Sequence, residues 1–223
     1  VLPLLTAAIY LVAGWGPRTA WLSTGSAVVV LAAVITLAAQ VSTSGPRTAA
    51  GGLLRADALS AFMLLVVAAV ALVACAATPA HLRGEISAGR ARTRTATQHS
   101  VLVQVFLSAM ALAVLASSLG LLWVAVEATT IVTAFLVGQR RTRAAVEAAW
   151  KYVVICSTGI AMALLGTFLL NYAAGRAGNG LDWAGLTANA SGLDPGVTRI
   201  AVVLLILGFG TKAGLAPLHS WLP

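Results

Sequence analysis

The chain has 223 residues, of which 60% are hydrophobic and 9% are charged, whereas about 25% of the residues in an ordinary soluble domain are charged. A soluble protein with 14 Lys and Arg and 6 Asp and Glu residues would expose large apolar patches and aggregate. This composition excludes a soluble enzyme, a disordered tail and a nucleic-acid-binding domain. The mean hydropathy of +0.95 indicates a polytopic membrane protein.

Apolar runs along the chain predict a single membrane domain over residues 1–223. The first run, 1–13, is shorter than the roughly 20 residues that a membrane-spanning helix needs, and the last run stops at the chain end. We therefore expect a fragment of a longer protein with a partial first helix. The full spans are expected at about 21–41, 57–77, 101–118, 119–138, 148–172 and 197–222.

Short loops separate these spans. Asp57 is expected to cap the second full span, and a polar turn at 117–120 separates the third from the fourth. The Arg- and Thr-rich segment 78–100 is expected to be a solvated, mobile loop.

Basic residues in the loops predict the orientation, because Lys and Arg are enriched on the cytoplasmic side. This bias, rather than a nucleic-acid-binding face, accounts for the net charge of +8. Nine basic residues fall on one side and four on the other, which predicts an outside N-terminus. The cytoplasmic set is Arg18, Arg83, Arg90, Arg92, Arg94, Arg140, Arg141, Arg143 and Lys151, and the opposite set is Arg47, Arg55, Arg176 and Arg199.

Two ionisable residues lie deep within predicted spans. Glu127 is near the middle of 119–138, and Lys212 is in the middle of 197–222. Each costs about 2.5–3.5 kcal/mol to insert at the centre of a membrane helix, so such residues usually have a function. The structural alternative is a buried ion pair that only holds two helices together.

The last span also contains a predicted break. Pro217 has no N–H to donate to the carbonyl of Ala213, so a helix must kink or end there. Gly214 and His219 flank this proline. Unpaired backbone at membrane depth is tolerated beside water or inside protein, and a cation next to a broken helix is typical of an ion or proton path.

Threonines accompany both charged residues, namely Thr130 and Thr133 near Glu127 and Thr211 beside Lys212. Their hydroxyls are candidates to line a water-filled path. The alternative is a hydrogen bond back to a carbonyl of their own helix. The sequence predicts no metal site and no cofactor site, because its two Cys and three His residues are scattered.

Three segments together resemble one family: LWVAVEATT at 122–130, EAAWKY at 147–152 and GFGTKAGLAPLHSWLP at 208–223. They look like the antiporter-like, proton-conducting membrane subunits of respiratory complex I and membrane-bound hydrogenases, especially the hydrogenase-4 component F type. The resemblance implies an all-α bundle of about seven helices that forms the first half of an inverted-repeat fold with about fourteen helices. It also implies that Glu127 and Lys212 are the family's paired glutamate and lysine, and that Pro217 and His219 lie in its broken helix.

The resemblance implies a proton-translocating subunit of a redox-driven complex in the cell inner membrane. Membrane subunits and hydrophilic redox subunits would be its partners, and iron–sulfur or nickel–iron centres would lie on those partners. The hypothesis is a relay of Glu127, Lys212 and His219. Two opposite charges about 6 Å apart attract by roughly 3 kcal/mol at an effective dielectric constant near 20, which is about a hundredfold in proton affinity.

Two alternatives remain open. One is a cation/proton antiporter subunit without a redox partner, which would use the same residues. The other is a membrane scaffold whose charge pair is inert. The sequence predicts no nucleophile–base set and therefore no active site of the chain's own.

Overall fold

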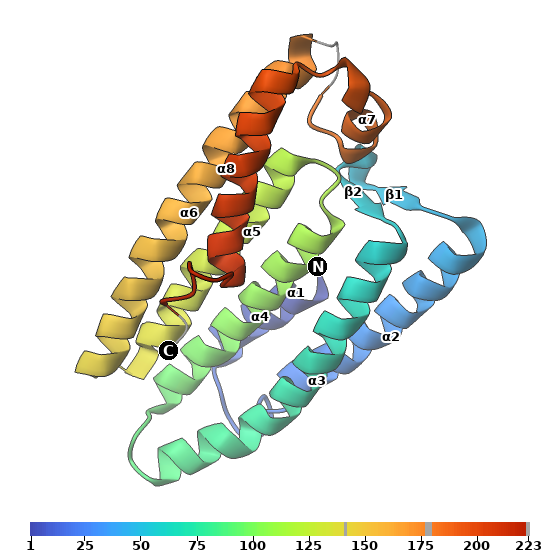
Figure 1. Cartoon of the computed structure of the whole chain (residues 1–223). Helices are drawn as coiled ribbons and strands as arrows, with labels where there is room; N and C mark the ends of the chain where they lie inside the picture. The colour runs from blue at the N-terminus through green and yellow to red at the C-terminus, as the bar shows by residue number, and fades with distance from the viewer. Residues whose placement is uncertain (141, 177–179, 222–223) are drawn as a thin grey trace. The chain divides into compact units, whose positions relative to one another are not determined.

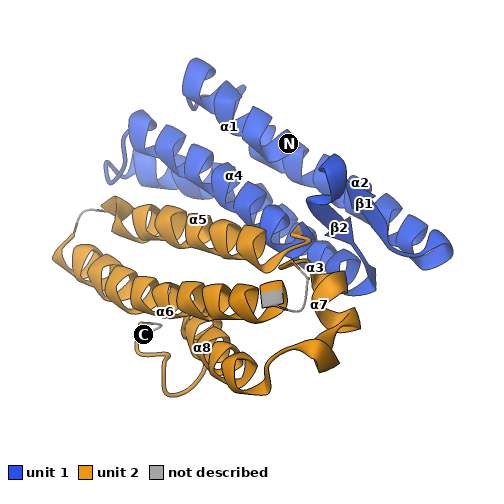
Figure 2. Ribbon diagram, turned by 90° about the horizontal axis from the view of Figure 1, so that it is seen from above, with its two compact units in different colours: residues 1–115 blue, residues 116–223 orange. Residues whose placement is uncertain are grey.

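The computed structural model describes residues 1–140, 142–176 and 180–221. The predicted all-α membrane architecture is confirmed, since six described helices are long and apolar enough to cross a membrane (Figure 1). The chain forms two compact units, residues 1–115 and 116–223 (Figure 2), within the span predicted as one membrane domain. Arg141 and the last residue of the predicted 197–222 span lie outside the described residues.

The first unit contains a short apolar helix and three candidate spans. They are α1 (Leu2–Ala13), α2 (Leu22–Ser44), α3 (Ala58–Ser87) and α4 (Thr93–Leu115). α2 packs on α3, and α1 packs on α4. A core of Val34, Leu64 and Ala68 joins α2 and α3, as expected for helices that bury one apolar stripe.

A small antiparallel hairpin, which was not predicted from the sequence, connects α2 to α3. Strands β1 (Arg47–Ala49) and β2 (Leu54–Ala56) pair across the short 3₁₀ turn η1 (Ala50–Gly52). Asp57 caps α3 as predicted, because its carboxylate accepts the Ser60 N–H at 2.9 Å.

The segment 78–100 is mostly helical, which corrects the expectation of a loop. α3 continues through Pro79 to Ser87, and α4 begins at Thr93. A helix that leaves the apolar layer continues as long as its residues favour helix, and Ala, Leu, Arg and Glu do so. Arg90, in the remaining connection, donates to Glu85 at 2.9 Å.

The second unit contains α5 (Leu119–Val137), the 3₁₀ turn η2 (Gly138–Arg140), α6 (Arg143–Arg176), α7 (Trp183–Ala188), the 3₁₀ turn η3 (Ala190–Gly192) and α8 (Pro195–Ala213). Ser118 caps α5 through the Leu121 N–H. α6 runs side by side with both α5 and α8 (Figure 1). α6 therefore forms the centre of this unit.

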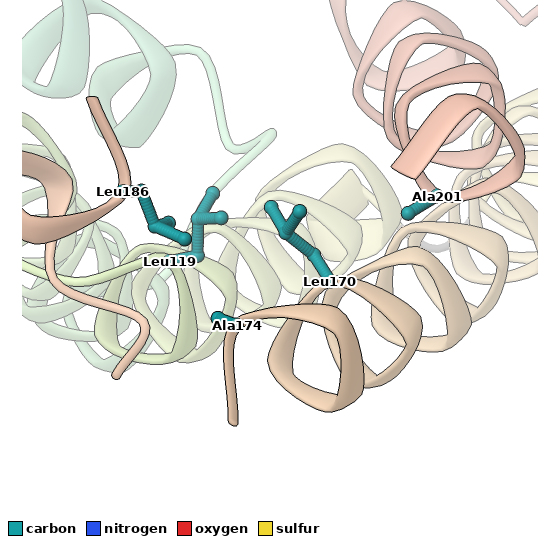
Figure 3. Packing of buried hydrophobic residues seen from close by; sticks show 5 residues of the cluster. All are labelled: Leu119, Leu170, Ala174, Leu186 and Ala201. Carbon is teal, nitrogen blue, oxygen red and sulfur yellow. The ribbon is translucent and has the colours of Figure 1, made fainter. Parts of the chain in front are cut away.

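An apolar cluster closes the end of the second unit where α5 and α8 begin. It brings together residues from α5, α6, α7 and α8, namely Leu119, Leu170, Ala174, Leu186 and Ala201 (Figure 3). Backbone hydrogen bonds from Leu119 N to Leu181 O at 3.1 Å and from Trp183 N to Ser117 O at 3.0 Å close the same end. This cluster fixes the starts of the two helices that carry Glu127 and Lys212.

Candidate functional site

The close approach of α6 and α8 determines where Lys212 lies. Small residues line this contact: a Cβ added to Gly208 would lie 2.5 Å from the Gly159 carbonyl oxygen, and one added to Gly159 would lie 2.6 Å from Thr211 Cβ. Small residues at such positions let membrane helices pack backbone to backbone. This contact therefore fixes the register of α8 against α6 within one turn of Lys212.

α8 ends directly after Lys212. Gly214 has a left-handed conformation, with φ 73° and ψ 33°, which glycine adopts without the steric penalty of a Cβ. Its N–H donates to the Thr211 carbonyl at 3.2 Å, and the Leu215 N–H donates to the Gly210 carbonyl at 3.0 Å, which is the pattern of a glycine-terminated helix. The helix therefore ends at Ala213, four residues before Pro217 and nine residues short of the predicted end of the span.

Lys212 faces α6. Its Nζ donates a hydrogen bond to the Tyr152 hydroxyl and lies 4.9 Å from the centre of the Tyr152 ring. Tyr152 is 3% exposed, so the amine contacts a buried aromatic side chain. An ammonium that donates to a hydroxyl forms a charge-assisted hydrogen bond, which is stronger than one between neutral groups.

Glu127 lies near the middle of α5 and faces the same region. Glu127 and Lys212 interact electrostatically, but within the described part of the chain no ion pair of 4.0 Å or less joins them. Glu127 Oε2 is buried and has no hydrogen-bond partner there. A buried carboxylate oxygen without a partner is costly, so this group has an unmet capacity to accept a proton or a hydrogen bond.

The predicted threonines adopt the alternative that the sequence left open. Thr130 donates to the Val126 carbonyl at 3.1 Å, Thr133 to the Thr129 carbonyl at 2.7 Å, and Thr211 to the Leu207 carbonyl at 2.7 Å. Each hydroxyl proton is therefore used within its own helix. The Thr130 and Thr133 oxygens still face the Tyr152 hydroxyl.

His219 and Pro217 lie on the non-helical segment that follows α8, and both are exposed. Among the hydrogen bonds of the described chain, none joins His219 to Lys212 or Glu127. The structure thus brings Glu127, Lys212 and two threonines together around Tyr152 and leaves His219 apart from them.

Three residues of the site were given no role at the sequence level. Tyr152 contacts Lys212, Cys156 is fully buried within electrostatic reach of both charged groups, and Trp221 meets the Tyr152 ring edge to face. The sequence signal for Tyr152 and Trp221 was their presence in the segments 147–152 and 208–223. Among the described residues, no group of three His, Cys, Asp or Glu side chains is arranged to hold a metal ion.

These features define a multi-pass helical membrane protein with a half-buried acid and a half-buried base on two of its spanning helices. Residues 116–223, which are the whole second unit, match the family described as "NADH:quinone oxidoreductase/Mrp antiporter, TM". This part of the chain belongs to that family, the antiporter-like membrane subunits of complex I and membrane-bound hydrogenases.

Relatives and solved structures extend the match into the first unit. The chain is 32% identical over 177 residues to the "Hydrogenase-4 component F homolog" of Methylacidiphilum infernorum, covering 78% of this chain and 37% of that protein. It superposes with a TM-score of 0.82 at 22% identity on a chain of the membrane-bound sulfane sulfur reductase, an archaeal respiratory membrane complex, covering 99% of this chain and 45% of that one.

A chain of the Mrp complex from Dietzia sp. DQ12-45-1b gives a TM-score of 0.78 at 23% identity, covering 99% of this chain and 41% of that one. Both structures therefore share the fold of the two units. The chain spans 37% of the length of the hydrogenase-4 component F homolog.

Proposed function

We propose that this chain is part of a proton-translocating membrane subunit of a redox-driven complex, and that Glu127 and Lys212 form its proton relay. The observation that carries the proposal is the pairing of a half-buried base with a half-buried acid whose Oε2 lacks a partner among the described residues. Lys212 Nζ on α8 reaches the Tyr152 hydroxyl on α6, and Glu127 Oε2 on α5 is buried without a hydrogen bond among the described residues. An inert structural pair would be expected to close into direct contact, because an open pair retains the desolvation cost and loses most of the attraction.

The relay follows from charge control. When Glu127 is ionised and near Lys212, the amine holds its proton more strongly. When the two groups separate, desolvation acts on the ammonium without compensation, and the proton leaves. The proton moves from Nζ to water beside the non-helical segment after Gly214, where His219 is the next titratable group along the chain. Lys212 is left neutral and ready to accept another proton.

In this proposal, the redox reaction that drives proton translocation takes place on partner subunits. The printed names of the relatives include a hydrogenase-4 component and a NADH-quinone oxidoreductase subunit, which supports a membrane-bound hydrogenase or a NADH:quinone oxidoreductase-like complex. Iron–sulfur or nickel–iron centres then belong to hydrophilic partner subunits. We also place the N-terminus outside the inner membrane, because nine of the loop cations fall on the opposite side.

A second candidate is a subunit of a cation/proton antiporter without a redox partner, and the likeness to the Mrp complex chain supports it. Sodium-dependent proton flux in vesicles would favour the antiporter. Copurification with iron–sulfur or nickel–iron subunits would favour the redox complex. An inert scaffold predicts that neither charged residue matters.

The test is redox-driven proton translocation by the full-length protein in its complex, in sealed membrane vesicles, with Glu127→Gln. The matched control is Glu147→Gln, which removes an exposed carboxylate that pairs with Lys151 at 2.6 Å. We expect Glu127→Gln to assemble and to lose most translocation, and Glu147→Gln to retain it. Normal translocation by Glu127→Gln would exclude its role in a relay.

A further inference from the structure

We propose that Tyr152 is a positioning residue for Lys212: its hydroxyl holds the ammonium at a resting position on α6, out of ion-pair contact with Glu127, and Trp221 holds Tyr152 in place. This inference rests on the proposed relay and adds a second partner for its lysine. It gives Lys212 two alternative partners, Tyr152 on α6 and Glu127 on α5.

The contact geometry supports a specific resting position. Lys212 Nζ donates to the Tyr152 hydroxyl and lies 4.9 Å from the ring centre, which places the ammonium at the hydroxyl end of the ring. Tyr152 is 3% exposed and Lys212 is half-buried, so the tyrosine side of the contact is shielded from water. Glu127 lies within electrostatic range but outside the 4.0 Å limit of an ion pair, among the residues that the structure describes.

Trp221 orients the tyrosine ring. Its indole meets the Tyr152 ring edge to face, with centroids 5.2 Å apart and planes at 76°, a favourable aromatic geometry. The Trp221 Nε1–H donates to the Thr211 carbonyl at 2.9 Å, next to Lys212 in the chain. The segment after the helix end is thereby tied to α8 and to the tyrosine that holds the lysine.

Titratable groups and threonine hydroxyls from α5 and α6 surround the contact between Lys212 and Tyr152. The titratable groups that act on Lys212 are Glu127 from α5 and Cys156 from α6, in addition to Tyr152 itself. Thr130 and Thr133 face the Tyr152 hydroxyl from α5. The Tyr152 hydroxyl therefore lies between the helix that carries the acid and the helix that carries the base.

A lysine with two partners must exchange them during each cycle. Leaving Tyr152 costs the hydrogen bond to its hydroxyl, and approaching Glu127 gains the attraction of the opposite charge. The Tyr152 contact thus sets how often the lysine reaches Glu127, and so the rate and the pH dependence of translocation. If Tyr152 were merely structural, removing only its hydroxyl would change neither the rate nor the pH dependence of translocation.

The first experiment measures redox-driven proton translocation by the full-length protein in its complex over a series of pH values. Tyr152→Phe removes the hydroxyl and keeps the ring, whereas Tyr152→Leu removes both. The control is Tyr172→Phe, the same change on the same helix about 30 Å away at 1.5 Å per residue, at a position that is 55% exposed.

We expect Tyr152→Phe to change the translocation rate by about tenfold or more, the loss of one hydrogen bond to a charged group, and to move the pH of half-maximal rate. Tyr152→Leu should have the larger effect on both, and Tyr172→Phe should match the unsubstituted protein. A Tyr152→Phe protein with an unchanged rate and an unchanged pH profile overturns the inference.

A second measurement does not depend on the folding of the Tyr152 variants. 3-Fluorotyrosine is placed at position 152 of the full-length protein, and its ¹⁹F resonance is compared with and without Lys212→Met. The same label at position 172 is the control. We expect the resonance at 152 to move more than the one at 172, and equal responses would overturn the contact.

The two proposals can fail separately. If Lys212→Met leaves translocation intact, the relay fails, whereas the fluorine measurement still tests the contact. If Lys212→Met abolishes translocation and Tyr152→Phe changes nothing, the positioning role alone is overturned.

Discussion

Gly208→Ala tests whether the contact between α6 and α8 fixes the position of Lys212. A Cβ at position 208 would lie 2.5 Å from the Gly159 carbonyl oxygen and 2.6 Å from the Ala163 nitrogen, both on α6. Because carbon contacts are favourable at about 3.5–4.0 Å, α8 must move away from α6 by roughly 1 Å. The obstacle is backbone, so no side-chain rotation relieves it.

The expected change in the free energy of unfolding of Gly208→Ala follows from two opposing contributions. Overpacking of a close contact costs about 1–3 kcal/mol, and the better helix propensity of Ala over Gly returns up to about 1 kcal/mol. We therefore expect Gly208→Ala to lower the free energy of unfolding by up to about 2 kcal/mol. Proton translocation should also fall, since Lys212 lies one turn further along the same helix.

Gly210→Ala is the matched control, two residues away on the same helix. Its added Cβ would approach only the side chain of Leu215, with the nearest atom at 3.1 Å, and a side-chain end can rotate away. The assay is the unfolding of the detergent-solubilised full-length protein, followed by helical circular dichroism, together with translocation in vesicles. Equal stability and equal translocation of the two variants would refute the argument that this contact positions α8.

Two further predictions concern local structure. Asp57→Ala should destabilise the protein by about 1 kcal/mol, because α3 loses its N-terminal cap. The Ser60 N–H lowers the pKa of the Asp57 carboxyl, so the contribution of this cap is present above the unfolded pKa of about 3.9 and is lost as pH falls through the folded pKa. When unfolding is measured across this pH range, the stability of Asp57→Asn should lack the pH-dependent contribution of the cap, because asparagine cannot titrate. Trp123→Phe removes the 2.8 Å hydrogen bond from Trp123 Nε1 to the Ile160 carbonyl and should cost about 1 kcal/mol in the same unfolding assay, whereas an unchanged stability would show that this bond contributes nothing net.

The spans and the two buried charges were predictable because each depends on local sequence. An apolar run of sufficient length predicts a membrane helix, and a charge in its middle is conspicuous whatever its neighbours are. Glu127 and Lys212 were identified in this way. The extension of α3 to Ser87 was not predicted, because hydropathy marks the apolar layer and not the end of the helix.

The tertiary contacts of the site were not predictable from one sequence. Tyr152 and Lys212 are separated by 60 positions, and their meeting depends on the register that Gly159 and Gly208 set between two helices. Pro217 indicated a helix break, but the left-handed Gly214 ends α8 earlier, since a glycine-terminated helix needs no proline. From the sequence, the threonine hydroxyls could equally line a water path or donate to their own helix, and only the folded structure distinguishes the two.

Proton translocation by the full-length protein in its complex with Lys212→Met, compared with Lys151→Met, tests the central claim most directly. Lys151 is an exposed lysine paired with Glu147, so both substitutions remove one ammonium from the same unit. The account predicts that Lys212→Met assembles but loses most of its translocation, and that Lys151→Met retains it. Normal translocation by Lys212→Met would contradict the account.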